Sequence, residues 1–257
     1  MMLLDYHVHA VAHGEYQYNC PWIRKFIETA RSRQLSEIGF TEHDEYAAKI
    51  DYRLLETLRQ EYDDITIKIG LEVDYWEGRE KQIQQLLSSY PYDYIIGSIH
   101  YLDGWAFDHP DYRDGFEQKD IDQVYKRYFQ LLGRMVDSGL FTIVGHFDLI
   151  KKWGHRPIGH RLNYYYDEVL NKIKKSDLCV ELNSAGLRKP VGELYPGPEV
   201  LKVMASMKIP ITLASDAHHP SEVGEGVREA AQAAWAAGYR EIASWSRGKR
   251  VMVPLFF

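Results

Sequence analysis

Short, continuously apolar runs alternate with longer amphipathic segments along the sequence, and the alternation repeats about seven times. Continuous apolar runs are typical of parallel strands buried on both faces, and a repeated strand–helix order predicts a parallel α/β barrel. The expected strands cover residues 3–7, 37–41, 67–73, 94–99, 142–146, 178–183 and 211–215, and the run 250–254 is expected to close or cover the barrel. The expected helices cover residues 22–33, 52–61, 79–89, 120–138, 161–175, 197–207 and 226–237.

Length, charge and cysteine content narrow the class of protein further. A chain of 257 residues suits one domain spanning 1–257, because α/β barrels commonly need about 250 residues. The net charge of −6, without a Lys/Arg-rich block, predicts no nucleic-acid partner, since phosphate neutralisation needs a basic face. Cys20 and Cys179 form no C-x-x-C pattern and are expected to be reduced. With no secretory signal and no apolar run of about 18 residues, the sequence predicts a cytoplasmic protein that does not cross a membrane.

Residues that commonly bind metals lie at the carboxyl ends of the expected strands. In a parallel barrel these ends share one rim, and barrel active sites are built there. Six of the 11 histidines belong to this set, an arrangement that chance seldom produces. In chain order the groups are His7 and His9, His43 and Asp44, Glu72 and Asp74, His100, His146 and Asp148, Asn183, and Asp216 and His218.

These strand ends predict a metal centre. Alternate residues on a strand point to the same side, so His7 and His9 can face one ion together. Imidazole combined with carboxylate suits zinc, iron or manganese better than calcium or magnesium alone. The spacing of His13, four residues after His9, leaves open whether it is a ligand. The histidines in loops or at helix starts are expected at the surface or in supporting positions: His109, His155, His160 and His219.

Other catalytic schemes have little support in the sequence. There is no G-x-S-x-G elbow, no H-E-x-x-H helix and no P-loop lysine motif. The glycines of GEGVRE follow a loop and not a strand, so they do not favour dinucleotide binding. Two long connections, 101–118 and 151–160, interrupt the strand–helix order, and long loops in a compact domain are usually functional or mobile.

Six short segments carry a resemblance to a known family. HVH, TEHD, GLEVD, GSIHYL, GHFD and SDAH resemble, in this order, the metal-binding motifs of the PHP (polymerase and histidinol phosphatase) superfamily. The longer segments YPYDYIIGSIHYL, WAFDHPD, SGLFTIVGHFDLIKKWGHR and LNSAGLRKP resemble its histidinol-phosphatase branch, and the resemblance covers essentially the whole chain. It implies a distorted (β/α)7 TIM-like barrel, a trinuclear cluster of divalent metals (Zn, Fe or Mn) and phosphomonoesterase activity.

The resemblance also implies how the ligands are shared among three metals. One metal takes His7, His9, Glu72 and Asp216, a second takes Glu72, His100 and His146, and a third takes His43, His218 and His13. Many relatives place five residues between the H-x-H pair and the next ligand, whereas only three separate His9 from His13 here. Glu15 is therefore an alternative to His13 at the third metal.

The implied reaction is hydrolysis of L-histidinol phosphate to L-histidinol and phosphate, a step of histidine biosynthesis. Metals bridged by Glu72 and held by Asp216 would bind a hydroxide between them, because bound water has its pKa lowered from about 15.7 towards 7. That hydroxide would attack phosphorus in line. Asp44 and His218 are the alternatives for the acid that protonates the leaving alkoxide.

The substrate groups are assigned from the loops beside the rim. Arg188, in the GLRKP segment, is expected to bind phosphate, and Lys152 either binds phosphate or is a surface charge. Asp108 and Tyr101, in the long fourth loop, are expected to face the ammonium or imidazole group of a small-molecule substrate. The alternatives are another PHP phosphoesterase, such as a nucleotidase or exonuclease, and a non-catalytic metal-binding module. The chain is expected to be a monomer or a homodimer.

Overall fold

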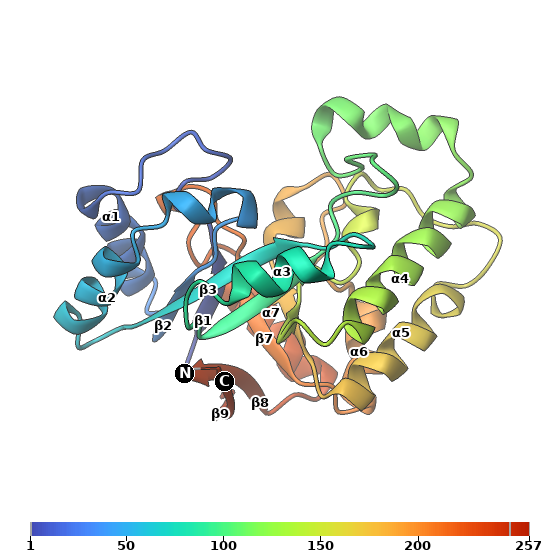
Figure 1. Cartoon of the computed structure of the whole chain (residues 1–257). Coiled ribbons are helices and arrows are strands. Elements are labelled where there is room, and N and C mark those ends of the chain that lie inside the picture. The colour runs from blue at the N-terminus through green and yellow to red at the C-terminus, as the bar shows by residue number, and fades with distance from the viewer. Residues whose placement is uncertain (1, 247, 257) are drawn as a thin grey trace.

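The computed structural model describes residues 2–246 and 248–256, which form a parallel sheet of seven strands surrounded by helices (Figure 1). The strands follow one another in chain order around the sheet, each paired in parallel with the next. All seven predicted strands are confirmed, with β5 shorter than expected. They are β1 (Leu4–Val8), β2 (Glu37–Phe40), β3 (Thr66–Asp74), β4 (Tyr94–Ser98), β5 (Ile143–Val144), β6 (Cys179–Asn183) and β7 (Ile211–Ala214).

The first and last strands meet and nearly close the sheet into a barrel. Val8, the last residue of β1, forms an isolated parallel bridge with Ala217, which follows β7 in the chain. The amide of His9 donates to the carbonyl of Ala217 at 2.7 Å, and the amide of Ala217 donates to the carbonyl of His7 at 3.2 Å. The predicted distorted (β/α)7 barrel is therefore confirmed, and the junction of β1 with the end of β7 lies among the predicted metal ligands.

Helices follow the strands and cover the outside of the barrel, as the sequence predicts. In the described residues they are α1 (Cys20–Ser32), α2 (Tyr52–Glu61), α3 (Glu80–Leu87), α4 (Ile121–Asp137), α5 (Asn163–Ser176), α6 (Pro198–Ser206) and α7 (Val227–Ala237). Helix α1 begins two residues before the predicted start, because the Asn19 side chain caps it by accepting from the Trp22 amide and Pro21 fits in its first turn.

The end of the chain forms a hairpin that the sequence only partly predicts. Strands β8 (Glu241–Ser246) and β9 (Lys249–Pro254) pair in antiparallel fashion and cover the end of the barrel where the strands begin (Figure 1). The hydroxyl of Thr212 donates to the carbonyl of Ala243 at 2.9 Å, and the ring of Trp245 packs against Tyr6. The run near residue 250 therefore covers the barrel without joining its sheet, and it leaves the opposite rim free for the site.

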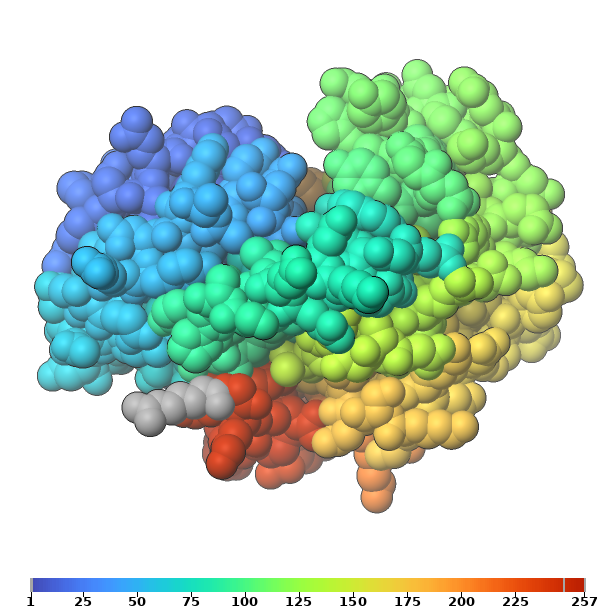
Figure 2. Space-filling view, viewed as in Figure 1, coloured from blue at the N-terminus to red at the C-terminus, as the bar shows by residue number. Residues whose placement is uncertain are grey.

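The two long connections lie together above that opposite rim. The first contains a 3-10 helix, η2 (Pro110–Gln118). The indole of Trp153 donates to the carbonyl of Phe107 at 2.9 Å, which joins the second connection to the first. Figure 2 shows the surface hollowed between the first connection, coloured green, and the N-terminal segments in blue. No helix among the described residues is long and apolar enough to cross a membrane, and Cys20 and Cys179 are both free.

Candidate metal centre

Glu72, near the end of β3, lies at the middle of the predicted ligands. Its Oε2 atom is 2.8 Å from Nδ1 of His43, 3.3 Å from Nε2 of His7 and 3.5 Å from Nε2 of His9. The three histidines come from the end of β1 and the loop after β2. Parallel pairing of β1, β2 and β3 brings these positions to the same height on the rim.

The other carboxylate oxygen of Glu72 faces a second pair of histidines. Oε1 is 3.0 Å from Nε2 of His146 and 3.6 Å from Nε2 of His100, and it accepts a hydrogen bond from the Ser98 hydroxyl at 2.6 Å. The two ring nitrogens are themselves 3.2 Å apart. Glu72 thus lies between two groups of imidazoles and presents one oxygen to each.

Asp216 faces the first of these groups from the loop after β7. Its Oδ1 atom lies 3.4 Å from Nε2 of His9, 3.8 Å from Nε2 of His7 and 3.7 Å from Nδ1 of His218. Its backbone has a φ of 55°, in the left-handed region that residues other than glycine adopt at a cost. Strain of this kind persists where the surrounding structure fixes it, and here the bridge between Val8 and Ala217 does so.

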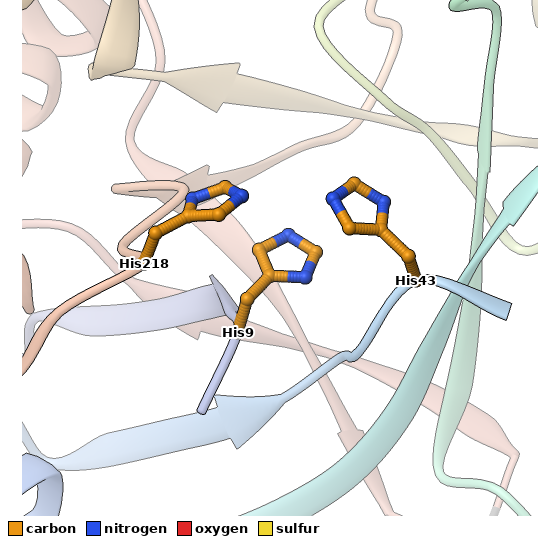
Figure 3. Close-up of side chains that lie close together, drawn as sticks. All are labelled: His9, His43 and His218. Atoms are coloured by element: carbon orange, nitrogen blue, oxygen red, sulfur yellow. The ribbon is translucent and has the colours of Figure 1, made fainter. Parts of the chain in front are cut away.

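A third group is formed by His9, His43 and His218, whose rings lie close together in Figure 3. Each of the three offers a nitrogen, and these nitrogens lie within 4.8 Å of one another. The ring of His13 stacks beside this group, 4.6 Å from the His218 ring and 5.5 Å from the His43 ring. Its side chain is largely exposed and has the Glu15 carboxylate 3.8 Å away. The structure therefore brings both His13 and Glu15 to the edge of the third group.

Two carboxylates orient ligand histidines from behind. Nδ1 of His7 is 2.9 Å from Oε2 of Glu181, and Nδ1 of His100 contacts Oδ1 of Asp74. A carboxylate that accepts a hydrogen bond from one ring nitrogen keeps the proton on that nitrogen. The other nitrogen is then free to bind a metal, as is common around metal-bound histidines. In both cases the free nitrogen is Nε2, the atom that faces Glu72.

Buried polar atoms that have no hydrogen-bond partner show that the group of residues fits a metal. Among the described residues, these atoms include Nε2 of His7, His9, His43 and His218, and Oε2 of Glu72. Buried polar groups in native proteins nearly always have a hydrogen-bond partner or a bound ion. Imidazole nitrogens and carboxylate oxygens that converge without hydrogen bonds between them suit a divalent cation of the zinc, iron or manganese type. The site is therefore a divalent-metal site by its chemistry.

The pKa directions agree with this interpretation. Burial, together with the charges of His43 and His218, holds the pKa of His9 well below its ordinary value, and burial lowers the pKa of His218 to about 4. Both rings are therefore neutral at pH 7, the form that binds metals. Burial alone would raise the pKa of Glu72, but the surrounding imidazoles outweigh it and hold the pKa well below its ordinary value.

His7 and His100 have pKa values shifted in the opposite direction. Burial opposes a charge on each ring, but nearby carboxylates outweigh it and raise the pKa. For His7 these carboxylates are Glu181 and Glu72, and for His100 they are Asp74 and Glu72. Without a metal, the excess negative charge of these carboxylates is offset by protons on the imidazoles. The same negative charge attracts a divalent cation, which would displace those protons.

A cavity of about 670 Å³ opens above the ligands, and the predicted substrate residues line it. Arg188 is mostly buried, donates from Nη2 to the Ser215 carbonyl at 2.8 Å, and has its Nη1 atom buried without a partner among the described residues. Lys152 donates to the carbonyl of Asp108 at 2.6 Å and lies 3.3 Å from its carboxylate. Tyr101 is more exposed, at the mouth of the cavity.

Asp44, one of the two predicted acids for the leaving group, does not line the cavity. Its side chain is 6% exposed; Oδ2 pairs with the Arg79 guanidinium and Oδ1 accepts from the Asp74 amide at 3.0 Å. Asp44 lines a neighbouring cavity of about 580 Å³ and not the one above the histidines. Both of its oxygens are occupied in holding the end of β3, so a role as the acid for the leaving group does not fit its position.

Sequence reasoning missed Glu181, although a signal for it was available. Glu181 is fully buried on β6, two residues before Asn183, and its Oε1 atom accepts from the His146 amide at 2.7 Å and from the Asn183 side chain at 2.8 Å. A carboxylate inside a continuously apolar run is costly to bury, so its presence in CVELN indicates a partner of positive or donor character. Residues two apart on a strand share a face, which directs Glu181 into the barrel.

Comparison with known proteins gives the class to which the fold and the site belong. Residues 5–185 match the family described as PHP domain, which is more than half of the sequence. The chain belongs to the PHP domain family.

Several proteins that resemble the chain over most of its length are named as histidinol-phosphatases. A protein of Deinococcus radiodurans named "Probable histidinol-phosphatase" is 34% identical over 244 residues, covering 86% of this chain and 88% of the relative. The histidinol-phosphatase of Lactococcus lactis is 25% identical over 264 residues, covering 96% and 95%. A crystal structure of histidinol phosphate phosphatase from Lactococcus lactis, complexed with zinc, L-histidinol and phosphate, has a TM-score of 0.81 at 24% identity over 97% of this chain and 98% of that one.

Proposed function

We propose that this chain is a histidinol-phosphatase, which hydrolyses L-histidinol phosphate to L-histidinol and phosphate in histidine biosynthesis. The observation that carries the proposal is Glu72, whose two oxygens face separate groups of imidazoles on the floor of a cavity. The names of the relatives support the substrate, and the 34% identity over most of the chain supports a shared activity. A cytoplasmic location, the absence of a nucleic-acid partner, and a monomeric or homodimeric state stay predictions from the sequence.

The proposal includes three metal ions at this site, held by a single domain spanning 1–257. His7, His9, Glu72 and Asp216 would hold the first, Glu72, His100 and His146 the second, and His43 and His218 the third, with His13 or Glu15. Zinc, iron and manganese all suit this combination of imidazole and carboxylate. When bound, such ions supply positive charge to phosphoryl oxygens and an activated water as nucleophile.

The chain's own residues would position the phosphate against this centre. Arg188 is fixed through one nitrogen by the Ser215 carbonyl and has a second, unpartnered nitrogen at the cavity. A guanidinium offers two parallel donors to a phosphate, and these remain in place as charge shifts among the oxygens during transfer. Neither of the predicted acids fits the proton needed by the leaving oxygen: Asp44 does not line the cavity, and the pKa of His218 is lowered to about 4, so its ring is neutral and suited to bind a metal.

The histidinol end of the substrate would lie towards the long fourth loop. Asp108 carries a carboxylate suited to an ammonium or imidazolium group, and Lys152 fixes it through contacts with both its carbonyl and its side chain. Burial opposes ionisation of Asp108, but the charges of His100 and Lys152 outweigh it and lower its pKa. Tyr101 supplies an aromatic face at the cavity mouth, where an imidazole ring would stack.

Phosphate release from a substrate panel tests the proposal. The purified chain, supplied with zinc or manganese, is assayed with L-histidinol phosphate, ribonucleotides, single-stranded DNA and phosphotyrosine. We expect the highest kcat/KM for L-histidinol phosphate, complete loss after treatment with a chelator, and recovery when the metal is returned. Preference for a ribonucleotide or DNA would identify a different phosphoesterase of the family, and no turnover of any substrate by metal-loaded protein would leave only a metal-binding module.

A further inference from the structure

The hydroxyl of Tyr195 is buried at the cavity without a hydrogen-bond partner among residues 2–246 and 248–256. The residue is only 1% exposed, so water does not surround the hydroxyl as it would at the surface. Burying a hydroxyl without a partner costs free energy, and native proteins seldom retain such a group without a use for it. Nη1 of Arg188 at the same cavity is likewise buried and unpartnered in the described structure. Two unused donors at one cavity indicate a ligand rich in acceptor atoms.

The position of Tyr195 is fixed by its surroundings. Its backbone pairs with Asn183 in both directions, with N–O distances of 2.7 and 2.9 Å. The ammonium of Lys151 donates to the carbonyl of Leu194 at 2.7 Å and stands 5.4 Å from the centre of the Tyr195 ring. Gly186 also packs closely against the ring, since an added Cβ would lie 3.0 Å from it. These contacts with the backbone, Lys151 and Gly186 fix the ring and with it the direction of its hydroxyl.

The electrostatic surroundings keep this hydroxyl protonated. Burial, together with the negative charges of Asp148 and Asp216, raises the pKa of Tyr195 above its ordinary value. At neutral pH the hydroxyl is therefore protonated and can donate a hydrogen bond. Since one Asp148 oxygen also lacks a partner in the described structure, a water between the two residues is the competing explanation.

We propose that the Tyr195 hydroxyl donates a hydrogen bond to a phosphoryl oxygen of the substrate, beside the guanidinium of Arg188. The inference rests on the proposed phosphatase function and adds a substrate contact to it. A phosphate monoester has several acceptor oxygens, so it can accept from Arg188 and Tyr195 at once. The hydrogen bond positions the phosphate, and no proton or covalent bond is transferred to Tyr195.

Tyr195→Phe separates this role from a structural one. Loss of a hydrogen bond to a charged oxygen should lower kcat/KM for L-histidinol phosphate by about 10–100-fold and weaken inhibition by inorganic phosphate by a similar factor. Because the hydroxyl has no protein partner in the described residues, its removal should leave the Tm unchanged or raise it. Tyr239→Phe is the matched control, because that buried hydroxyl donates to the Ile209 carbonyl at 2.9 Å and does not line the cavity. It should lower the Tm and leave kcat/KM unchanged.

The outcomes distinguish the two proposals. Wild-type protein that is loaded with metal but inactive on L-histidinol phosphate would overturn the proposed function. Active wild type with a fully active Tyr195→Phe variant would overturn only the inference about Tyr195. A lower Tm with unchanged kcat/KM would identify the water-mediated structural role instead, and a loss of activity that merely follows a loss of bound metal would also contradict the substrate contact.

Discussion

Nδ1 of His7 lies 2.9 Å from Oε2 of Glu181, and this contact directs Nε2 of His7 towards Glu72. The other oxygen of Glu181 accepts from the backbone amide of His146, 2.7 Å away. One buried carboxylate on β6 therefore fixes the ring of a ligand from β1 and the backbone of a ligand after β5. The ligands on the rim are coupled through the interior of the barrel as well as through any shared ion.

Glu181→Gln tests this coupling by removing the charge while keeping the shape. We expect metal affinity to fall by about 10–100-fold, because carboxylates behind a ligand histidine fix its tautomer and its orientation. Competition with a chromophoric chelator measures the affinity. Glu199→Gln, on the exposed face of α6, is the matched control and should bind metal like the wild type. Equal affinities for both variants and the wild type would show that His7 is held without Glu181.

Glu72→Ala should remove more metal than the loss of any single histidine, because Glu72 presents one oxygen to each of two groups. His146→Ala, for comparison, removes a ligand from one group only. Elemental analysis of protein purified in excess metal measures the bound ions, and circular dichroism verifies that the variants fold. His109→Ala alters an exposed histidine in the fourth loop and should retain the wild-type metal content. The assignment of Glu72 fails if His109→Ala and Glu72→Ala lose equal amounts.

The strands and most of the rim could be predicted because they follow from local patterns. Continuous apolar runs gave β1 to β7, and their carboxyl ends had to share one rim in a parallel barrel. His7, Glu72 and His146 therefore converge in the structure as their sequence positions require. The hairpin was harder to predict, because EIASWS in β8 carries a weaker apolar pattern than the barrel strands.

The direction of individual side chains beyond the strand ends could not be predicted. Asp44 adjoins His43 in the sequence, yet it turns to Arg79, which lies 35 residues further along the chain. Tyr195 lies in an irregular segment with no periodicity, and its backbone pairing with the distant Asn183 helps to bring it to the cavity. Such positions depend on tertiary contacts between distant segments, which a single sequence does not reveal.

Asp44→Ala should destabilise the protein more than it impairs catalysis. The change leaves the Arg79 guanidinium, 14% exposed, without its carboxylate partner, at a cost of about 1–3 kcal/mol in the free energy of unfolding. Denaturant unfolding measures that loss, and kcat is measured on metal-loaded protein. Asp103→Ala is the control, because Asp103 pairs with Arg127 at the surface and exposed ion pairs contribute about 0–1 kcal/mol.

A large effect of Asp44→Ala on kcat would contradict the structural role that we infer from the position of Asp44. If kcat falls by about 100-fold or more while metal content stays at the wild-type level, Asp44 acts on the leaving group in spite of its pairing with Arg79. A fall of less than about tenfold, together with lower stability, agrees with a residue that supports the end of β3.

Arg188→Ala separates phosphate recognition from a structural charge. Arg188 is fixed at Nη2 by the Ser215 carbonyl and has Nη1 unpartnered in the described structure, so its free edge is available to phosphoryl oxygens at the cavity. Without the guanidinium, kcat/KM for L-histidinol phosphate should fall by about 10²–10³-fold. Arg188→Lys should recover only part of this loss, because lysine offers a point charge and not two parallel donors.

The controls for Arg188 distinguish an effect on substrate binding from an effect on metal binding. Metal content and Tm of Arg188→Ala should stay near the wild-type values, since the guanidinium faces the Ser215 carbonyl and the Glu225 carboxylate, neither of which is a proposed ligand, and is proposed to contact substrate. Arg228→Ala removes a guanidinium on the exposed face of α7 that does not line the cavity, and it should leave kcat/KM unchanged. If Arg188→Ala is as active as Arg228→Ala, the phosphate is held by the metals without it. In that case the unpartnered Nη1 atom would need a structural explanation, such as a bound water.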